Sequence, residues 1–80
     1  MAKMRINLTF PEQLIKEPVI YNLSKNYDIV TNIRRANVEQ KVGWVILEIE
    51  GSEEALENGL KYLEDVGVRV DRLDGDVIES

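Results

Sequence analysis

Apolar and polar residues alternate along several segments of the chain, with the period of a half-buried β-strand. The first segment divides into an apolar and a polar face: Met4, Ile6, Leu8 and Phe10 against Arg5, Asn7 and Thr9. Two further strands are predicted at 29–38 and 42–50, joined by a short polar turn that makes them a hairpin. A last strand is predicted at 68–73.

Two other segments carry apolar residues at helical spacing. We predict that Pro18 is the first residue of one helix, which ends near Tyr27. Ser52 is placed to cap the second helix and Gly67 to end it. The apolar stripes of the two helices are Ile20, Leu23 and Tyr27, and Leu56, Leu60 and Leu63.

The order β-α-β-β-α-β predicts a ferredoxin-like α+β fold. Two right-handed crossovers place both helices on one face of a four-stranded antiparallel sheet, in the strand order 4-1-3-2. We expect one domain over residues 1–80, with residues 74–80 as a loose C-terminal tail. The predicted core on the helix-facing side is Ile6, Leu8, Phe10, Ile33, Val45, Leu47, Ile49, Val68 and Val70.

The opposite side of the sheet mixes apolar and charged residues. Its predicted members include Val30, Trp44 and Ile46, together with Asn32 and Arg34. Apolar side chains on a face that the helices cannot cover call for a partner. We therefore predict a homodimer whose twofold interface lies on this face or on the edge strand 29–38 and involves Val30, Trp44 and Ile46. Trp44 is expected to pack in the core or at an interface, with direct stacking on a ligand as the alternative, and an ion pair with Glu48 is the alternative for Arg34.

Composition excludes several classes of chemistry. The chain has neither cysteine nor histidine, so thiolate or imidazole zinc sites and Ser/His or Cys/His catalysis are ruled out. No segment has the length of a signal peptide's apolar region or of a membrane span, and we expect a cytoplasmic protein without membrane insertion. The net charge of −5 disfavours nucleic acid as a partner. We therefore predict no enzyme and no cofactor.

The chain resembles the NIL domain, a small ferredoxin-like module named for an Asn-Ile-Leu motif. The residues that carry the resemblance span most of the chain: Glu17-Pro18-Val19-Ile20, Tyr27-Asp28-Ile29, Asn32-Ile33, Gly43-Trp44, Leu47-Glu48-Ile49-Glu50-Gly51 and Leu63-Glu64-Asp65-Val66-Gly67-Val68. Such modules occur at the C-terminus of the ATPase subunit of methionine ABC transporters, and fused to ferredoxin-type iron–sulfur domains linked to sulfur amino-acid metabolism.

The resemblance implies a homodimeric regulatory domain that binds methionine between subunits. The motif asparagine corresponds to Asn32, with Ile33 beside it, and Arg34 stands where the motif has leucine. Arg34-Arg35-Ala36-Asn37-Val38 looks more like the ferredoxin-fused modules, whose implied role is assistance in sulfur transfer, with a protein or an acidic metabolite as partner.

Two hypotheses follow. In the first, the protein senses a sulfur-containing amino acid, or a related carboxylate, through Asn32, Ile33 and Arg34 at a dimer interface. We expect that site between subunits because a filled 80-residue core leaves no internal cavity of the usual ~300 Å³. In the second, the protein is an interaction module that acts in trans with a ferredoxin-like or transporter partner.

Overall fold

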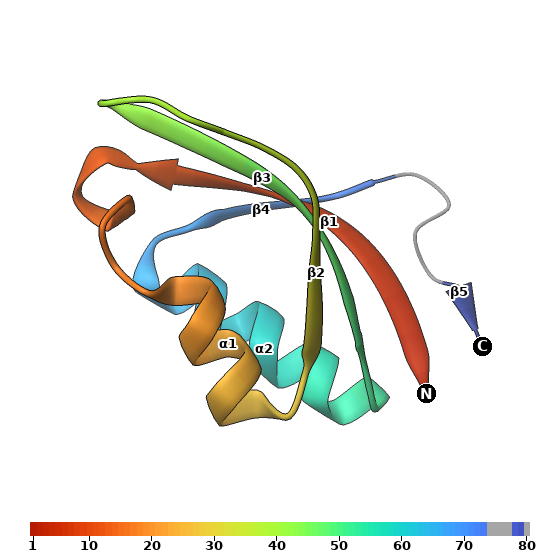
Figure 1. Cartoon of the computed structure of the whole chain (residues 1–80). Coiled ribbons are helices and arrows are strands. Elements are labelled where there is room, and N and C mark those ends of the chain that lie inside the picture. Colours follow the sequence, from red (N-terminus) through yellow and green to blue (C-terminus); the bar gives the residue numbers. More distant parts are fainter. Residues whose placement is uncertain (74–77, 80) are drawn as a thin grey trace.

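The computed structural model describes residues 1–73 and 78–79. The chain forms β1 (Ala2–Pro11), η1 (Glu12–Leu14), α1 (Val19–Tyr27), β2 (Val30–Val38), β3 (Val42–Gly51), α2 (Glu53–Val66), β4 (Arg69–Arg72) and β5 (Ile78–Glu79), of which η1 is a single 3-10 turn. Both α-helices lie against the same, concave face of a curved sheet (Figure 1). The predicted α+β ferredoxin-like arrangement is thus confirmed.

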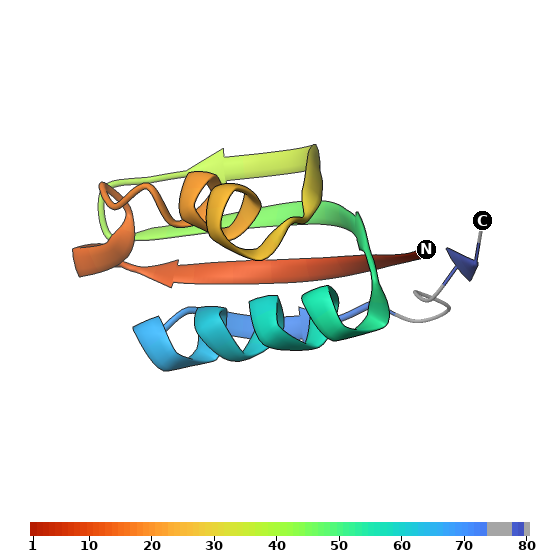
Figure 2. The same cartoon turned by 90° about the horizontal axis from the view of Figure 1, so that it is seen from below.

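The sheet is antiparallel and runs in the order β2-β3-β1-β4, which is the predicted order 4-1-3-2 read from the other edge. Figure 2 shows β2 at one margin of the sheet and β4 close to α2 at the other. In addition, β5 pairs with the start of β1, opposite Ala2 and Lys3. The rest of the predicted tail, 74–77 and Ser80, lies outside the described residues.

The core lies between the helices and the concave face of the sheet. Alternation along the two central strands points Ile6 and Leu8 of β1, and Leu47 and Ile49 of β3, toward the helices, where they are fully buried. Leu63 of α2 closes over them and is also fully buried. Each such side chain stabilises the fold by about 1.5–3 kcal/mol, so the two central strands anchor the domain.

Ile33 is the predicted core residue that the helices leave uncovered. It pairs with Leu47 and faces the helices as predicted, yet 55% of its surface is exposed. The prediction that it belongs to the core is therefore wrong. The reason is length: α1 has nine residues and spans about 13 Å, whereas the nine residues of β2 extend over about 30 Å.

A β-bulge interrupts the alternation of β2. Ile33 stands opposite Leu47 and Arg35 stands opposite Ile46, which leaves Arg34 as the extra residue. Two residues of the bulged strand then oppose one residue of its neighbour. Each later residue of β2 therefore lies on the face opposite to the one that strict alternation predicts. Ala36 consequently lies on the helix-facing side.

The ends of the helices follow their capping residues. The hydroxyl of Ser52 accepts a hydrogen bond from the Ala55 N–H at 3.0 Å, and Gly67, with φ of 103°, ends α2 as predicted. Pro18 precedes α1 as its cap and is not its first residue as predicted, because its carbonyl already accepts the first helical hydrogen bond, from Asn22 at 2.9 Å. Neither helix among the described residues is both long and apolar enough to cross a membrane.

Gly59 sets the distance between the two helices. It lies in the middle of α2, and a Cβ added there would come within 2.4 Å of Ile29 Cδ1 and 2.9 Å of Leu23 Cδ1. Both of those side chains are buried, so they have little space into which to move. The absence of a side chain at Gly59 therefore leaves the space that Leu23 of α1 and Ile29, just before β2, occupy in the core.

We expect Gly59→Ala to lower the free energy of unfolding by about 1–2 kcal/mol, since overpacking exceeds the ~1 kcal/mol gained in helix propensity. Urea denaturation measures the change. Ile29→Val removes the closest atom and should cost less stability in the Gly59→Ala background than in the wild-type chain. A Gly59→Ala protein more stable than the wild type would contradict this account.

Candidate functional site

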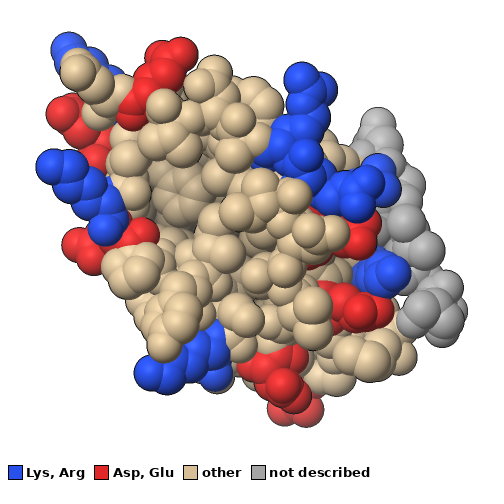
Figure 3. Space-filling model, viewed as in Figure 1, with Lys and Arg blue, Asp and Glu red and all other residues tan. Residues whose placement is uncertain are grey.

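An apolar hollow opens on the concave side of the sheet, where α1 leaves the β2–β3 hairpin uncovered. Its volume is about 290 Å³, close to the ~300 Å³ at which small-molecule pockets begin. Figure 3 shows it as a depression within an uncharged stretch of the surface. A single chain therefore offers a surface hollow of this size beside its core. The prediction that a ligand binds between subunits excluded only an internal cavity, so it stays a prediction.

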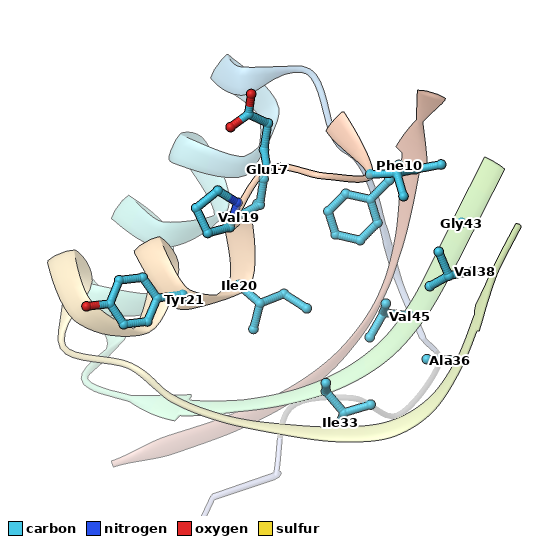
Figure 4. Close-up of a pocket in the computed structure, with 12 residues that line it drawn as sticks. Phe10, Glu17, Val19, Ile20, Tyr21, Ile33, Ala36, Val38, Gly43 and Val45 are labelled. Carbon is cyan, nitrogen blue, oxygen red and sulfur yellow. The ribbon is translucent and has the colours of Figure 1, made fainter. Parts of the chain in front are cut away.

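The lining of the hollow comes from the hairpin, from α1 and from the end of β1. It consists of Phe10, Ile15, Glu17, Pro18, Val19, Ile20, Tyr21, Ile33, Ala36, Val38, Gly43 and Val45. Figure 4 shows Ile20 pointing across the space toward the hairpin, while the carboxylate of Glu17 points away from it. The hollow thus suits an apolar tail, and a polar head group would find its partners only at the rim.

The three motif residues lie on one strand but do not share one pocket. Only Ile33 lines the hollow. Asn32 stands opposite Glu48 and faces the other side of the sheet. Arg34 is the extra residue of the bulge between Ile33 and Arg35, and it lies at the outer margin of the sheet. The predicted site residues therefore lie on both faces of β2 and at its outer edge.

The helix-free side of the sheet, which we call the open face, carries the residues predicted for the dimer interface. Trp44 and Ile46 are half-buried there, and Val30 is 60% exposed. The Nε of Arg5 lies 3.4 Å from Oε2 of Glu48. Glu48 therefore pairs with Arg5 rather than with Arg34, the alternative that the sequence suggested.

Sequence reasoning missed the residues that make the hollow. Ala36 and Val38 line it only because the bulge exchanges the faces of β2 after Ile33. A signal was present in the sequence, since the consecutive charges of Arg34 and Arg35 cannot both fit a strict alternation along a strand.

Over residues 1–73 and 78–79, no group of three or more His, Cys, Asp or Glu side chains lies close enough together to hold a metal ion.

Comparison with known proteins connects this fold to a family. The sequence model of the NIL domain matches residues 4–72. The chain is 40% identical over 53 residues to the L-aspartate semialdehyde sulfurtransferase iron-sulfur subunit of Methanocaldococcus jannaschii, a match that covers 66% of this chain and 40% of that protein. The chain thus accounts for well under half of that relative's length.

Solved structures share the fold at low sequence identity. The C-terminal domain of an ABC transporter / ATP-binding protein from Enterococcus faecalis superposes with a TM-score of 0.78 at 18% identity, over 90% of this chain and 84% of that one. Prephenate dehydratase from Streptococcus mutans gives a TM-score of 0.61 at 17% identity, over 90% of this chain and 41% of that enzyme.

We expect Arg34→Leu to change the free energy of unfolding by less than about 0.5 kcal/mol, because an exposed bulge residue supports no core contact. Leu47→Ala, in the same region but fully buried, should cost about 2–5 kcal/mol. Denaturant titration of both variants checks the contrast. A loss of more than about 1.5 kcal/mol in Arg34→Leu would show that the bulge residue is structural.

Proposed function

The chain belongs to the NIL domain family, and on this premise we propose that it is a non-catalytic, cytoplasmic regulatory domain that binds a sulfur-containing amino acid, or a related carboxylate, at the β2 margin of the sheet. The observation that carries the proposal is the apolar hollow beside the motif strand, with Ile33 in its lining. Its volume of about 290 Å³ suits a small ligand with an apolar tail.

The head group of the ligand would bind at the rim. The guanidinium of Arg34 can take a carboxylate in bidentate fashion, and it stands in the strand between two residues that line the hollow, Ile33 and Ala36. Asn32 offers both a donor and an acceptor, but it lies on the open face. A ligand in the hollow of one chain therefore reaches Asn32 only around the strand edge or in a second subunit.

We also propose a homodimer through the open face, which is the side of the sheet opposite the hollow. Val30, Trp44 and Ile46 lie on the same face as Asn32, so a twofold contact through these apolar residues brings two asparagines close to one interface. A ligand that extends from the hollow around the strand edge to Asn32 would therefore also reach this interface.

The alternative function is that of an interaction module in sulfur amino-acid metabolism. It is favoured by the relative in M. jannaschii, an iron-sulfur subunit of a sulfurtransferase, of which the matched part makes up 40%. A chain that corresponds to that part alone would act in trans, on a ferredoxin-like or transporter protein.

Isothermal calorimetry tests the ligand site. We expect wild-type protein to bind methionine, homocysteine or a carboxylate precursor, and Asn32→Ala and Ala36→Trp to lose at least about tenfold in affinity, the latter because the indole fills the hollow. Lys61→Trp, which adds the same side chain on the exposed face of α2, is the matched control. Arg34→Leu restores the motif leucine and should shift preference from precursors toward methionine.

Absence of binding by all these proteins, with the fold intact, would leave the interaction module as the function. Equal binding by wild type and Ala36→Trp would instead place the ligand outside the hollow.

Analytical ultracentrifugation tests the dimer. We expect a concentration-dependent dimer at tens of micromolar, which Trp44→Glu weakens by about tenfold or more, because a charge enters an apolar contact. Tyr21→Glu, on α1 and away from the open face, is the control. Only monomer in the wild-type protein would contradict the proposed assembly.

A further inference from the structure

One margin of the sheet carries a long strand with an unused edge. β2 pairs with β3 on one side only, and none of the described residues forms a strand on its other side. Eight of its nine residues are exposed. The N–H and C=O groups along such an edge are directed at solvent and can accept a further strand.

The strand at the opposite margin is shorter and carries charges of both signs. β4 has four residues, and its Arg69 Nε lies 3.2 Å from Oδ2 of Asp71. Four residues can pair with only a short stretch of another strand, and Arg69 is already paired with a carboxylate of the same strand. A docking edge on this sheet is therefore β2.

Exposed apolar side chains gather on the same strand. Seven large apolar residues are exposed in the described part of the chain, and three of them, Val30, Ile33 and Val38, belong to β2 with exposed fractions of 55–61%. Ile33 and Val38 also line the hollow. A strand added at about 4.8 Å from β2 would direct alternate side chains toward this space, so the hollow gives a pocket for one of them.

The charge of β2 selects the partner. Arg34 and Arg35 are its charged residues, and it contains no carboxylate, although the whole chain carries a net charge of −5. A second copy paired antiparallel over the full length of β2 has its twofold axis near Arg34, the middle residue, and so would place the arginines of both chains together. Like charges across a strand pair are destabilising. An acidic segment has no such penalty and offers carboxylates to both guanidinium groups.

We propose that β2 is a docking edge for an extended segment of another protein, in which apolar residues alternate with one or two carboxylates. The segment would extend the sheet at β2, bury an apolar side chain in the hollow, and pair its carboxylates with Arg34 and Arg35. This inference rests on the alternative function above, and it names the surface and the chemistry of the partner.

A display library of nine-residue segments, randomised at all positions, tests the proposal against the folded protein. We expect the selected segments to be enriched in Asp and Glu and in β-branched residues. The strongest of them, made as a synthetic peptide, should lose about tenfold or more in affinity when its acidic residues are changed to lysine. It should also lose binding when alternate backbone nitrogens are methylated, because methylation removes the donors of a strand ladder.

The chain offers matched variants for the same peptide. Arg34→Glu/Arg35→Glu should abolish its binding, whereas Arg69→Glu/Arg72→Glu, which makes the same change of net charge on the opposite edge, should leave affinity within about threefold. In NMR spectra the peptide should shift the amides of residues 30–38 and of Ile20. Hydrogen exchange should slow for those β2 amides that point away from β3.

Three results would overturn the proposal: no acidic enrichment in the selected segments, equal loss of affinity in both double variants, or perturbed amides centred on α2 or β4. In each case Arg34 and Arg35 serve instead as charges that keep a bare edge from aggregating. The calorimetry of sulfur amino acids has its own outcome, so failure of the docking edge and failure of the ligand site are distinguished.

Discussion

The architecture depends on the close approach of α2 to the segment that ends α1 and begins β2. Gly59 makes it possible, since the positions that its side chain would occupy belong to Ile29 and Leu23. With α1 held next to α2 in this way, the short first helix is drawn toward the middle of the concave face. It cannot at the same time cover the far end of the hairpin. The apolar hollow is thus a consequence of how the helices pack, and no separate device is needed to create it.

Much of the fold could be predicted because the two central strands alternate without interruption. Met4, Ile6 and Leu8 on β1 face the same side as Leu47 and Ile49 on β3, and this pattern determines the side that the helices cover. The order of the elements along the chain, with right-handed crossovers, determines the order of the strands. Ser52 and Gly67 mark the ends of the second helix through their own side-chain and backbone chemistry. Where burial or capping allows a residue only one position, the sequence is sufficient to predict it.

The candidate site was harder to predict because it lies where those constraints are weakest. The edge strand pairs on one side only and most of its apolar residues are exposed, so its pattern does not determine which way a side chain points. One extra residue at Arg34 brought Ala36 and Val38 into the hollow, and the shortness of α1 left Ile33 exposed. The resemblance to the NIL domain pointed to the strand beside the hollow, but the arrangement of Asn32, Ile33 and Arg34 around its edge could be seen only in the structure.

The bulge also frees one position of this strand from the constraints of pairing. A residue in regular alternation must fit the side chains opposite and beside it in the sheet, which limits the residue types that can occupy its position. Arg34 has no residue of its own opposite it in β3, so its identity can change while the core and the pairing on either side stay as they are. A leucine, an arginine or another side chain at this point would leave the stability of the fold nearly unchanged. Such a position can differ among related domains while the scaffold they share still folds.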